Sequence, residues 1–231
     1  MIFNQPMKRK VVTTQDGSKT IRLEEWDEHY HSTHGAIQES QHVYIEAGLN
    51  YFTARTQAKS ISVLEAGFGT GLNALLTYSW SQKSDIQIDY RGIEAFPISE
   101  DERQALEYHQ KIDGEDIESV FKKLHQAPWE DWSEISKSFR LKKQKLFFSD
   151  LDLKNEADVV FYDAFGPRVQ PELWEKSVFQ SFYLALKPGG IFVTYSVKGT
   201  ARRALQAIGF EVDIIEGPPG KRHMMRAYKP C

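Results

Sequence analysis

Residues 61–71 read ISVLEAGFGTG, an apolar run that ends in an acid and then in glycines at positions 67, 69 and 71. The run Ile61–Leu64 predicts a buried strand, and Leu72–Trp80, directly after the last glycine, predicts a helix. Glycines in such a turn let the backbone bend sharply and approach a ligand, where a β-carbon would collide. The stretch therefore predicts a strand, a ligand-binding loop and a helix.

Downstream of this stretch, short apolar runs alternate with helical segments, which is typical of a mostly parallel sheet covered by helices. The pattern predicts an α/β fold with five parallel strands and a terminal antiparallel hairpin that turns at Gly217–Gly220. The seven expected strands are Ile61–Leu64, Ile86–Ile93, Lys145–Phe148, Val159–Tyr162, Gly190–Tyr195, Phe210–Ile215 and Met224–Tyr228. The expected helices are Leu72–Trp80, Ser99–His109, Glu115–Trp132, Pro171–Leu186 and Thr200–Ile208.

Upstream, residues 1–58 are expected to form an extension to a main domain of residues 59–231. Val11–Leu23 alternates weakly around Asp16-Gly17, a dipeptide suited to a tight hairpin turn. The segment 26–51 contains a helix-like stretch at Glu39–Leu49 and is expected to form a cap over the fold.

Composition excludes several classes of protein. The 231 residues carry a formal net charge of −3, which argues against a protein that coats nucleic acid through a global positive field. The single cysteine, Cys231, can build neither a disulfide framework nor a cysteine-rich zinc site. The first ten residues have no apolar core of a signal peptide, and no apolar run approaches the length of a membrane span. We expect a soluble cytoplasmic protein.

The glycine loop favours a cationic ligand. Its G-x-G-x-G spacing lacks the third glycine position of a dinucleotide fingerprint, and Glu65 places a carboxylate where a pyrophosphate would be repelled. S-adenosylmethionine has an ammonium group and a sulfonium and no phosphate, so it suits this loop. The alternative is a turn that only packs the strand against the helix.

Two further acids follow predicted strands. Glu94 ends the second strand, where a carboxylate can accept both hydroxyls of a ribose. Asp150 follows the third strand and could accept from an adenine amino group. Capping of the next helix is the alternative for Glu94, and capping or solvation for Asp150.

After the fourth strand comes Asp163-Ala164-Phe165-Gly166-Pro167. In an open α/β sheet the loops after the first and fourth strands face the same crevice, so Asp163 is expected near the transferred group. An acid, an aromatic ring and a proline-stiffened loop resemble the motif with which amino-directed methyltransferases hold a nitrogen nucleophile. The alternative is an acid bonded to its own loop, and then Tyr30, Glu39 or Tyr195 would face the amine.

The last part of the chain is basic. Residues 198–231 carry seven lysines and arginines against three acids, a net charge of +4 in an acidic protein. Arg202, Arg203, Lys221 and Arg222 are therefore candidates for binding phosphates, with an ordinary solvated surface as the alternative.

Three histidines, His29, His31 and His34, lie close together without acidic or thiolate partners nearby. We expect them to be hydrogen-bonded or solvent-facing, and we expect no metal site.

Several motifs together resemble one family, the bacterial tRNA 5-methylaminomethyl-2-thiouridine methyltransferases of the MnmC/MnmD group. The resemblance covers nearly the whole chain from about Tyr30. Its motifs are Gly35–Ser40 with Val43-Tyr44, Glu65–Asn73, Glu94–Pro97, Asp163–Pro167 with Pro171–Trp174, Arg202–Gln206 with Gly209-Phe210, and Gly220–Arg222. The acid-aromatic-proline loop followed by Pro-x-x-Trp is more specific than any glycine loop.

The resemblance implies a Rossmann-like class I methyltransferase that uses S-adenosylmethionine and methylates the aminomethyl group of a wobble uridine in the tRNA anticodon stem-loop. It implies no metal, and no protein partner is inferred. The implied cofactor contacts are Glu65, Gly67, Phe68, Gly69, Thr70, Gly71, Asn73, Glu94 and Asp150, with Asp163 facing the amine. The implied substrate contacts are Phe165, Pro167, Trp174, Arg202, Arg203, Lys221 and Arg222.

The sequence also departs from the family. Larger members fuse an FAD-dependent oxidase, whereas this sequence has no second dinucleotide loop, so we expect a stand-alone type without FAD. In the loop that begins at Asp163, called the acid loop below, Gly166 and residues 168–170 differ from the Ala-Pro-Ala-Lys-Asn form of the family. The substrate contacts of this loop are therefore left open. Two alternatives remain: a small-amine methyltransferase or aminopropyltransferase on the same fold, and a non-catalytic RNA-binding protein that keeps the cofactor site.

Overall fold

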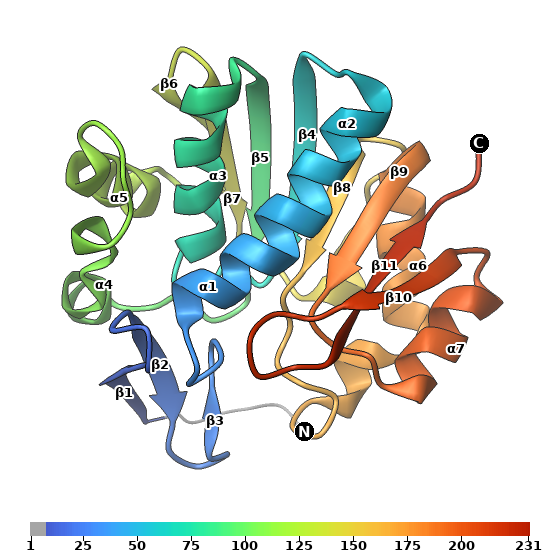
Figure 1. Ribbon diagram of the computed structural model, residues 1–231, viewed down its shortest axis with the longest axis horizontal. Coiled ribbons are helices and arrows are strands. Elements are labelled where there is room, and N and C mark those ends of the chain that lie inside the picture. Colours follow the sequence, from blue (N-terminus) through green and yellow to red (C-terminus); the bar gives the residue numbers. More distant parts are fainter. Residues whose placement is uncertain (1–7) are drawn as a thin grey trace.

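The computed structural model describes residues 8–231. An eight-stranded sheet runs through the molecule, with helices on both faces (Figure 1). Its strand order is β10-β11-β9-β8-β4-β5-β7-β6, and β9, β8, β4, β5 and β7 are parallel. The strands are β4 Ser60–Ala66, β5 Gln87–Ile93, β6 Trp132–Ser136, β7 Phe139–Gln144, β8 Ala157–Tyr162, β9 Leu186–Thr194, β10 Glu211–Glu216 and β11 His223–Tyr228. The α/β class, the five parallel strands and the terminal antiparallel hairpin are confirmed.

Alternating side chains along the central strand β4 divide the core into two layers. Ile61 and Val63 are buried in one layer, and Leu64 and Ala66 in the other. Burial on both faces is what a parallel sheet requires, and it accounts for the uninterrupted apolar run in the sequence.

The helices fall into the same two layers. One face of the sheet is covered by the N-terminal helix (α1, η1 and α2), α3 and α5, and the other face by α6 and α7. Their bounds are α1 Ala36–Ser40, η1 Gln41–Asn50, α2 Tyr51–Thr56, α3 Leu72–Ser84, α4 Glu100–Leu106, η2 Tyr108–Gln110, α5 Ile117–Gln126, η3 Phe148–Asp150, η4 Pro171–Trp174, α6 Lys176–Ala185 and α7 Gly199–Ala207.

The N-terminal hairpin is also confirmed. Strands β1 Arg9–Thr13 and β2 Lys19–Leu23 pair across a turn at Asp16-Gly17, and β3 Glu28–His29 adds a short third strand. This small sheet lies beside the carboxyl ends of β4 and β5 (Figure 1), where the Arg9 guanidinium donates to the carbonyls of Phe96 and Pro97.

The helical stretch that follows is longer than expected. The three helical segments run without a break from residue 36 to residue 56 and share a hydrophobic core with the sheet through Val43, Tyr44 and Leu49. The division of the chain at residue 58 stays a prediction.

The third predicted strand was misplaced. Residues 145–148, predicted as a strand, form a loop and the start of the 3-10 helix η3, and the parallel strand is β7. The predicted helix 115–132 ends at Gln126, since β6 follows and pairs antiparallel with β7 as an eighth strand. Both strands were missed because charged side chains interrupt them, although Phe139, Leu141 and Lys143 alternate toward the interior.

The predicted helix 171–186 is also divided. It consists of the 3-10 helix η4 and then α6, with Glu175 in extended conformation between them. The strand predicted at Gly190–Tyr195 begins earlier in the structure, since β9 starts at Leu186 and includes Pro188 and Gly189.

The layer beneath α6 provides a test of this packing. Phe179 is fully buried, with its ring against those of Tyr162, Trp174 and Phe192. Phe179→Ala should lower the free energy of unfolding by about 3–5 kcal/mol, because it opens a cavity in the core. Leu184→Ala on the same helix, at a side chain that is 44% exposed, is the matched control and should change it by less than about 0.5 kcal/mol in urea titrations. Equal effects of the two substitutions would contradict this assignment of the core.

Candidate active site

The candidate site lies where the carboxyl ends of β4, β5 and β8 meet. Backbone hydrogen bonds join the three ends: the amide of Gly67 donates to Ile93 at 3.0 Å, and the amide of Asp163 donates to Ala66 at 3.0 Å. The strand order reverses at β4, because the chain passes first to β5 on one side and later to β8 on the other. Ligands of open α/β sheets bind at such a point.

The glycine loop requires glycine for two different reasons. Gly67 has a φ of 88°, and a β-carbon there would lie 2.7 Å from the carbonyl oxygen of Asp163. Gly71 has a φ of 74° and caps the N-terminus of α3. The loop therefore turns sharply between strand and helix while it lies against the loop after β8.

Two predicted cofactor residues support this loop from beneath. The side chains of Phe68 and Thr70 are buried, the Phe68 ring lies against that of His125, and the Tyr108 hydroxyl donates to Thr70 Oγ1 at 3.1 Å. Lys143 Nζ donates to the carbonyl of His125 at 2.6 Å, so a buried lysine fixes that histidine. These side chains shape the loop, and contacts of Phe68 and Thr70 with a cofactor stay predictions.

Glu65 and Asn73 form the buried floor of the site. Asn73 Nδ2 donates both to Glu65 Oε1, at 2.9 Å, and to Asp163 Oδ2, at 2.8 Å. Glu65 Oε2 and Asn73 Oδ1 are buried acceptors that accept no hydrogen bond of good geometry among the described residues, although the Tyr90 hydroxyl lies close enough to Glu65 to favour its charged form. Burial raises the pKa of Glu65 well above its usual range. Free acceptors and a carboxyl that gains its charge beside a cation fit the ammonium group of S-adenosylmethionine.

Glu94 lies directly against the glycine loop. Its Oε2 accepts from the amide of Gly69 at 2.9 Å, and its Oε1 accepts from the amide of Phe96 at 2.8 Å. The structure thus brings Glu94 to the loop at the end of β5, where the sequence predicted an acid.

Asp150 is placed differently from expectation. It lies in η3, six residues beyond the end of β7, and its exposed carboxylate accepts a hydrogen bond from the Ser149 hydroxyl at 3.1 Å. A contact between Asp150 and an adenine stays a prediction.

Asp163 occupies a setting that favours its neutral form. Loss of hydration raises the pKa of its carboxyl to about 7, although hydrogen bonds from Tyr44 and Asn73 favour the charged form. The nearby carboxylate of Glu39 also raises this pKa, and the ammonium group of Lys221 lowers it. A carboxylate with a pKa near neutrality is a better proton acceptor than an ordinary aspartate.

Aromatic rings surround the acid loop. The ring of Phe165 lies edge-on to Tyr30, at 4.9 Å between centroids, and to Trp26, at 6.0 Å. Pro167 is partly exposed, and its carbonyl accepts from Lys198 Nζ at 3.3 Å.

Trp174, which was expected to contact the substrate, lies in the core beside the acid loop, and a contact with the substrate stays a prediction. Trp174 is 4% exposed, its ring lies against Tyr162 and Phe179, and its indole N–H donates to the carbonyl of Phe165 at 2.8 Å. Trp174 therefore holds the acid loop from within the core.

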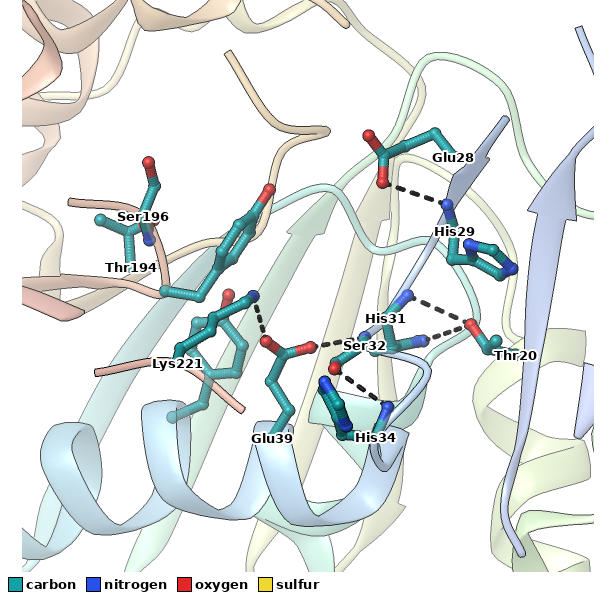
Figure 2. A network of polar contacts seen from close by, with 12 residues as sticks. Thr20, Glu28, His29, His31, Ser32, His34, Glu39, Thr194, Ser196 and Lys221 are labelled. Carbon is teal, nitrogen blue, oxygen red and sulfur yellow. Dashed lines mark hydrogen bonds and ion pairs between the residues drawn. The ribbon is translucent and has the colours of Figure 1, made fainter. Parts of the chain in front are cut away.

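The predicted basic residues do not form one group. Arg202 and Arg203 on α7 and Arg222 in the β10–β11 loop are exposed. Lys221 instead forms an ion pair with Glu39, and its Nζ lies 4.0 Å from the centre of the Tyr195 ring. Figure 2 shows Lys221 and Glu39 directed toward each other above the N-terminal helix.

The histidines of the N-terminal segment are hydrogen-bonded, as expected. His31 is buried and its Nδ1 lies 3.2 Å from the Thr20 hydroxyl (Figure 2). His34 Nδ1 lies 3.0 Å from Gln15 Oε1. Burial lowers the pKa of His31 to about 4, so it is neutral at physiological pH.

Three residues of this site come from the N-terminal segment: Tyr30 and Glu39 were named from the sequence only as alternatives to Asp163, and Tyr44 only as part of a family motif. Tyr44 and Glu39 come from the N-terminal helix, and Tyr30 comes from the segment before it. The Gly35–Ser40 and Val43-Tyr44 motifs marked this region as part of the family pattern, but strand order gave no reason to place it beside Asp163.

Comparisons with known sequences agree with this geometry. A family model described as S-adenosyl-L-methionine-dependent methyltransferase matches residues 119–230. The tRNA 5-methylaminomethyl-2-thiouridine biosynthesis bifunctional protein MnmC of Leptospira borgpetersenii is 31% identical over 216 residues, which are 87% of this chain and 32% of that protein. The MnmC protein of Paraburkholderia xenovorans is 28% identical, with the same coverage. The chain thus spans about a third of the length of these curated relatives.

Two solved structures share the fold. MnmC2 from Aquifex aeolicus superposes with a TM-score of 0.74 and 24% identity, over 99% of this chain and 74% of that one. Spermidine synthase from Thermotoga maritima gives a TM-score of 0.60 and 13% identity, over 98% and 70% of the two chains. Within residues 8–231, no helix combines the length and the apolar character needed to cross a membrane.

The sequence matches and the arrangement of Glu65, Glu94 and Asp163 around the glycine loop agree: the chain is similar to the MnmC proteins, and its residues 119–230 match the family of S-adenosyl-L-methionine-dependent methyltransferases.

Proposed function

We propose that this protein transfers the methyl group of S-adenosylmethionine to the aminomethyl nitrogen of 5-aminomethyl-2-thiouridine at the wobble position of tRNA. The product is 5-methylaminomethyl-2-thiouridine. One observation carries the proposal: a single amide, that of Asn73, joins the acid of the glycine loop to Asp163. A cation bound at Glu65 and an amine bound at Asp163 would therefore be neighbours.

The cofactor would be held by three groups of this chain. Glu65 and the free carbonyl of Asn73 would accept from its ammonium group, and Glu94 would accept from its ribose hydroxyls. When bound, S-adenosylmethionine supplies a methyl group on a sulfonium, and no metal is required. Asp150 is proposed to contact the adenine.

Asp163 would act on the amine. An alkylammonium has a pKa near that of lysine, about 10, and must lose a proton before it can attack. The Asp163 carboxylate attracts the ammonium and accepts that proton, which then passes to water. As the nitrogen–carbon bond forms, the carbon–sulfur bond breaks and its electron pair stays on sulfur. Alignment of the two partners contributes most of the acceleration.

The anticodon loop would bring the base to this site. Its bases are already exposed, so the wobble uridine can be turned into the pocket at low cost. Phe165 is the proposed stacking partner, Pro167 borders the opening, and Arg202, Arg203 and Arg222 would contact phosphates. We place the reaction in the cytoplasm and propose no requirement for FAD.

The direct test is incubation with S-adenosylmethionine and tRNA from cells that lack this methylation, followed by nucleoside mass spectrometry. The proposal requires loss of 5-aminomethyl-2-thiouridine and gain of the methylated nucleoside. A parallel assay offers putrescine and decarboxylated S-adenosylmethionine, in order to test for aminopropyl transfer. Turnover of that pair alone would identify an aminopropyltransferase, and binding of cofactor without any turnover would identify a non-catalytic protein.

The first prediction from this function concerns Glu94. Glu94→Ala should weaken binding of S-adenosylmethionine by about 10²-fold, because charge-assisted hydrogen bonds to the ribose disappear. Isothermal calorimetry measures this effect, and Glu118→Ala at an exposed acid of α5 is the control, expected to bind normally. Unchanged affinity in the Glu94 variant would remove this residue from the cofactor site.

The second prediction concerns Asp163. Asp163→Asn keeps the shape of the side chain but loses its negative charge and basicity, so single-turnover methyl transfer should fall by about 10²-fold or more at saturating tRNA. The wild-type rate should rise with pH through about 7, as the carboxyl loses its proton, and the variant should lose this rise.

Stability provides the control for Asp163. A carboxyl whose pKa is raised by folding destabilises the folded state as the pH rises through that pKa. Asp163→Asn should therefore unfold at pH 8 at a Tm no lower than that of the wild type. A rate within a few-fold of wild type in a folded variant would show that Asp163 is structural.

The third prediction concerns the tRNA surface. Arg202→Glu with Arg203→Glu should raise the KM for tRNA about tenfold or more and flatten its dependence on salt, while cofactor affinity stays unchanged. Lys59→Glu with Lys83→Glu, at exposed lysines directly before β4 and in the last turn of α3, is a matched control and should leave KM unchanged. An equal response of both pairs would mean that α7 is not the binding surface.

A further inference from the structure

An ion pair beside the acid loop connects distant parts of the chain. Glu39 Oε1 accepts from Lys221 Nζ, and Glu39 Oε2 accepts from the amide of Ser32 at 2.6 Å (Figure 2). The Glu39 side chain is 8% exposed and that of Lys221 is 33% exposed. Glu39 therefore lies in the interior, with both of its oxygens bonded.

The same lysine reaches the acid loop through Tyr195. Lys221 Nζ lies 4.0 Å from the centre of the Tyr195 ring, and the Tyr195 hydroxyl donates to the carbonyl of Ala164 at 2.8 Å. Ala164 directly follows Asp163. A continuous series of contacts thus runs from the N-terminal helix through Lys221 and Tyr195 to the proposed catalytic loop.

We propose that Glu39 and Lys221 are positioning residues, which hold the acid loop through Tyr195 and balance the charge around Asp163, and that Lys221 is not a tRNA contact. This proposal rests on the function proposed above only in that Asp163 is taken as the residue that accepts the proton of the amine. A lysine committed to a buried carboxylate and an aromatic face would lose both contacts if it turned outward to a phosphate.

Titratable groups approach Asp163 from several elements. Besides Glu39 and Lys221, they are Tyr44 from the N-terminal helix, Glu65 from β4, Tyr90 from β5 and Tyr195 directly after β9. The four groups other than the ion pair are buried, and burial raises their pKa values well above the usual range. Glu39 and Lys221 are therefore the two groups of this set that carry opposite charges toward Asp163 near neutral pH.

The ion pair of Glu39 and Lys221 therefore predicts two shifts of opposite sign in the pKa of Asp163. Loss of the Glu39 charge removes a repulsion, so Glu39→Gln should lower the pKa of Asp163. Loss of the Lys221 charge removes an attraction, so Lys221→Met should raise it. Lys221→Arg keeps the charge and should keep the wild-type pKa. A purely structural role would not produce opposite shifts.

The experiment follows Asp163 directly by carbon NMR of protein labelled at the aspartate carboxyls, with the Asp163 signal assigned by its absence from Asp163→Asn. The wild-type titration is expected near 7, and each single variant is expected to move it by at least half a pH unit in its own direction. The double variant Glu39→Gln/Lys221→Met leaves no unpaired charge, so it should fold and titrate between the two. This readout needs no turnover, so its outcome is independent of the tRNA assay.

The matched control is Lys187→Met, which breaks a similar ion pair with Asp158 at the amino end of β8. It should leave the Asp163 titration unchanged. In the tRNA assay, Lys221→Met should move the acid limb of the kcat profile to higher pH and leave the KM for tRNA within about twofold. A raised KM with an unmoved titration would overturn the proposal and identify Lys221 as a tRNA contact. Shifts of the same sign in both single variants would also overturn it.

Discussion

The arrangement of this site depends on one side-chain amide that lies between two buried carboxyls. Asn73 has two amide hydrogens, and it gives one to Glu65 and the other to Asp163. Two acids at the ends of adjacent parallel strands would otherwise share a space with little water, where like charges repel strongly. Asn73 can lie between them because α3 begins immediately after the glycine loop. The positions of the glycine loop, the start of α3 and the two acids therefore depend on one another.

The site places the carboxyls of Glu65 and Asp163 in the core, where loss of hydration is unfavourable, and well-packed neighbouring side chains hold the two loops in place. Phe68 packs against Gly92, where a β-carbon would lie 2.5 Å from its ring, and His125 and Lys143 hold the loop from below. The acid loop is held in a similar way by the indole of Trp174 and the hydroxyl of Tyr195. Carboxyls with raised pKa values are common in active sites, because a pKa near neutrality suits proton transfer.

The sequence predicted the centre of the fold better than its edges. Strand β4, the glycine loop and α3 were recognisable because a buried parallel strand and a glycine turn have strong local patterns. Glu94 and Asp163 followed from strand order alone. Strands β6 and β7 were missed because, near the edge of the sheet, charged residues alternate with the buried ones. The roles of Trp174 and Lys221 depend on partners that no local pattern reveals, since Lys221 and Glu39 are separated by 182 positions.

That separation has a consequence for the order of folding. Contacts between residues far apart in sequence form late, because the entropy of closing the intervening chain must be overcome first. The β4–glycine loop–α3 unit is local and can assemble early, whereas the ion pair waits for the final hairpin to dock beside the N-terminal helix. A nascent chain still held on the ribosome before residue 221 has emerged therefore carries the elements of a cofactor loop without a finished acid loop. Under the proposed function, the pocket for methyl transfer would then be complete only after the final hairpin has docked.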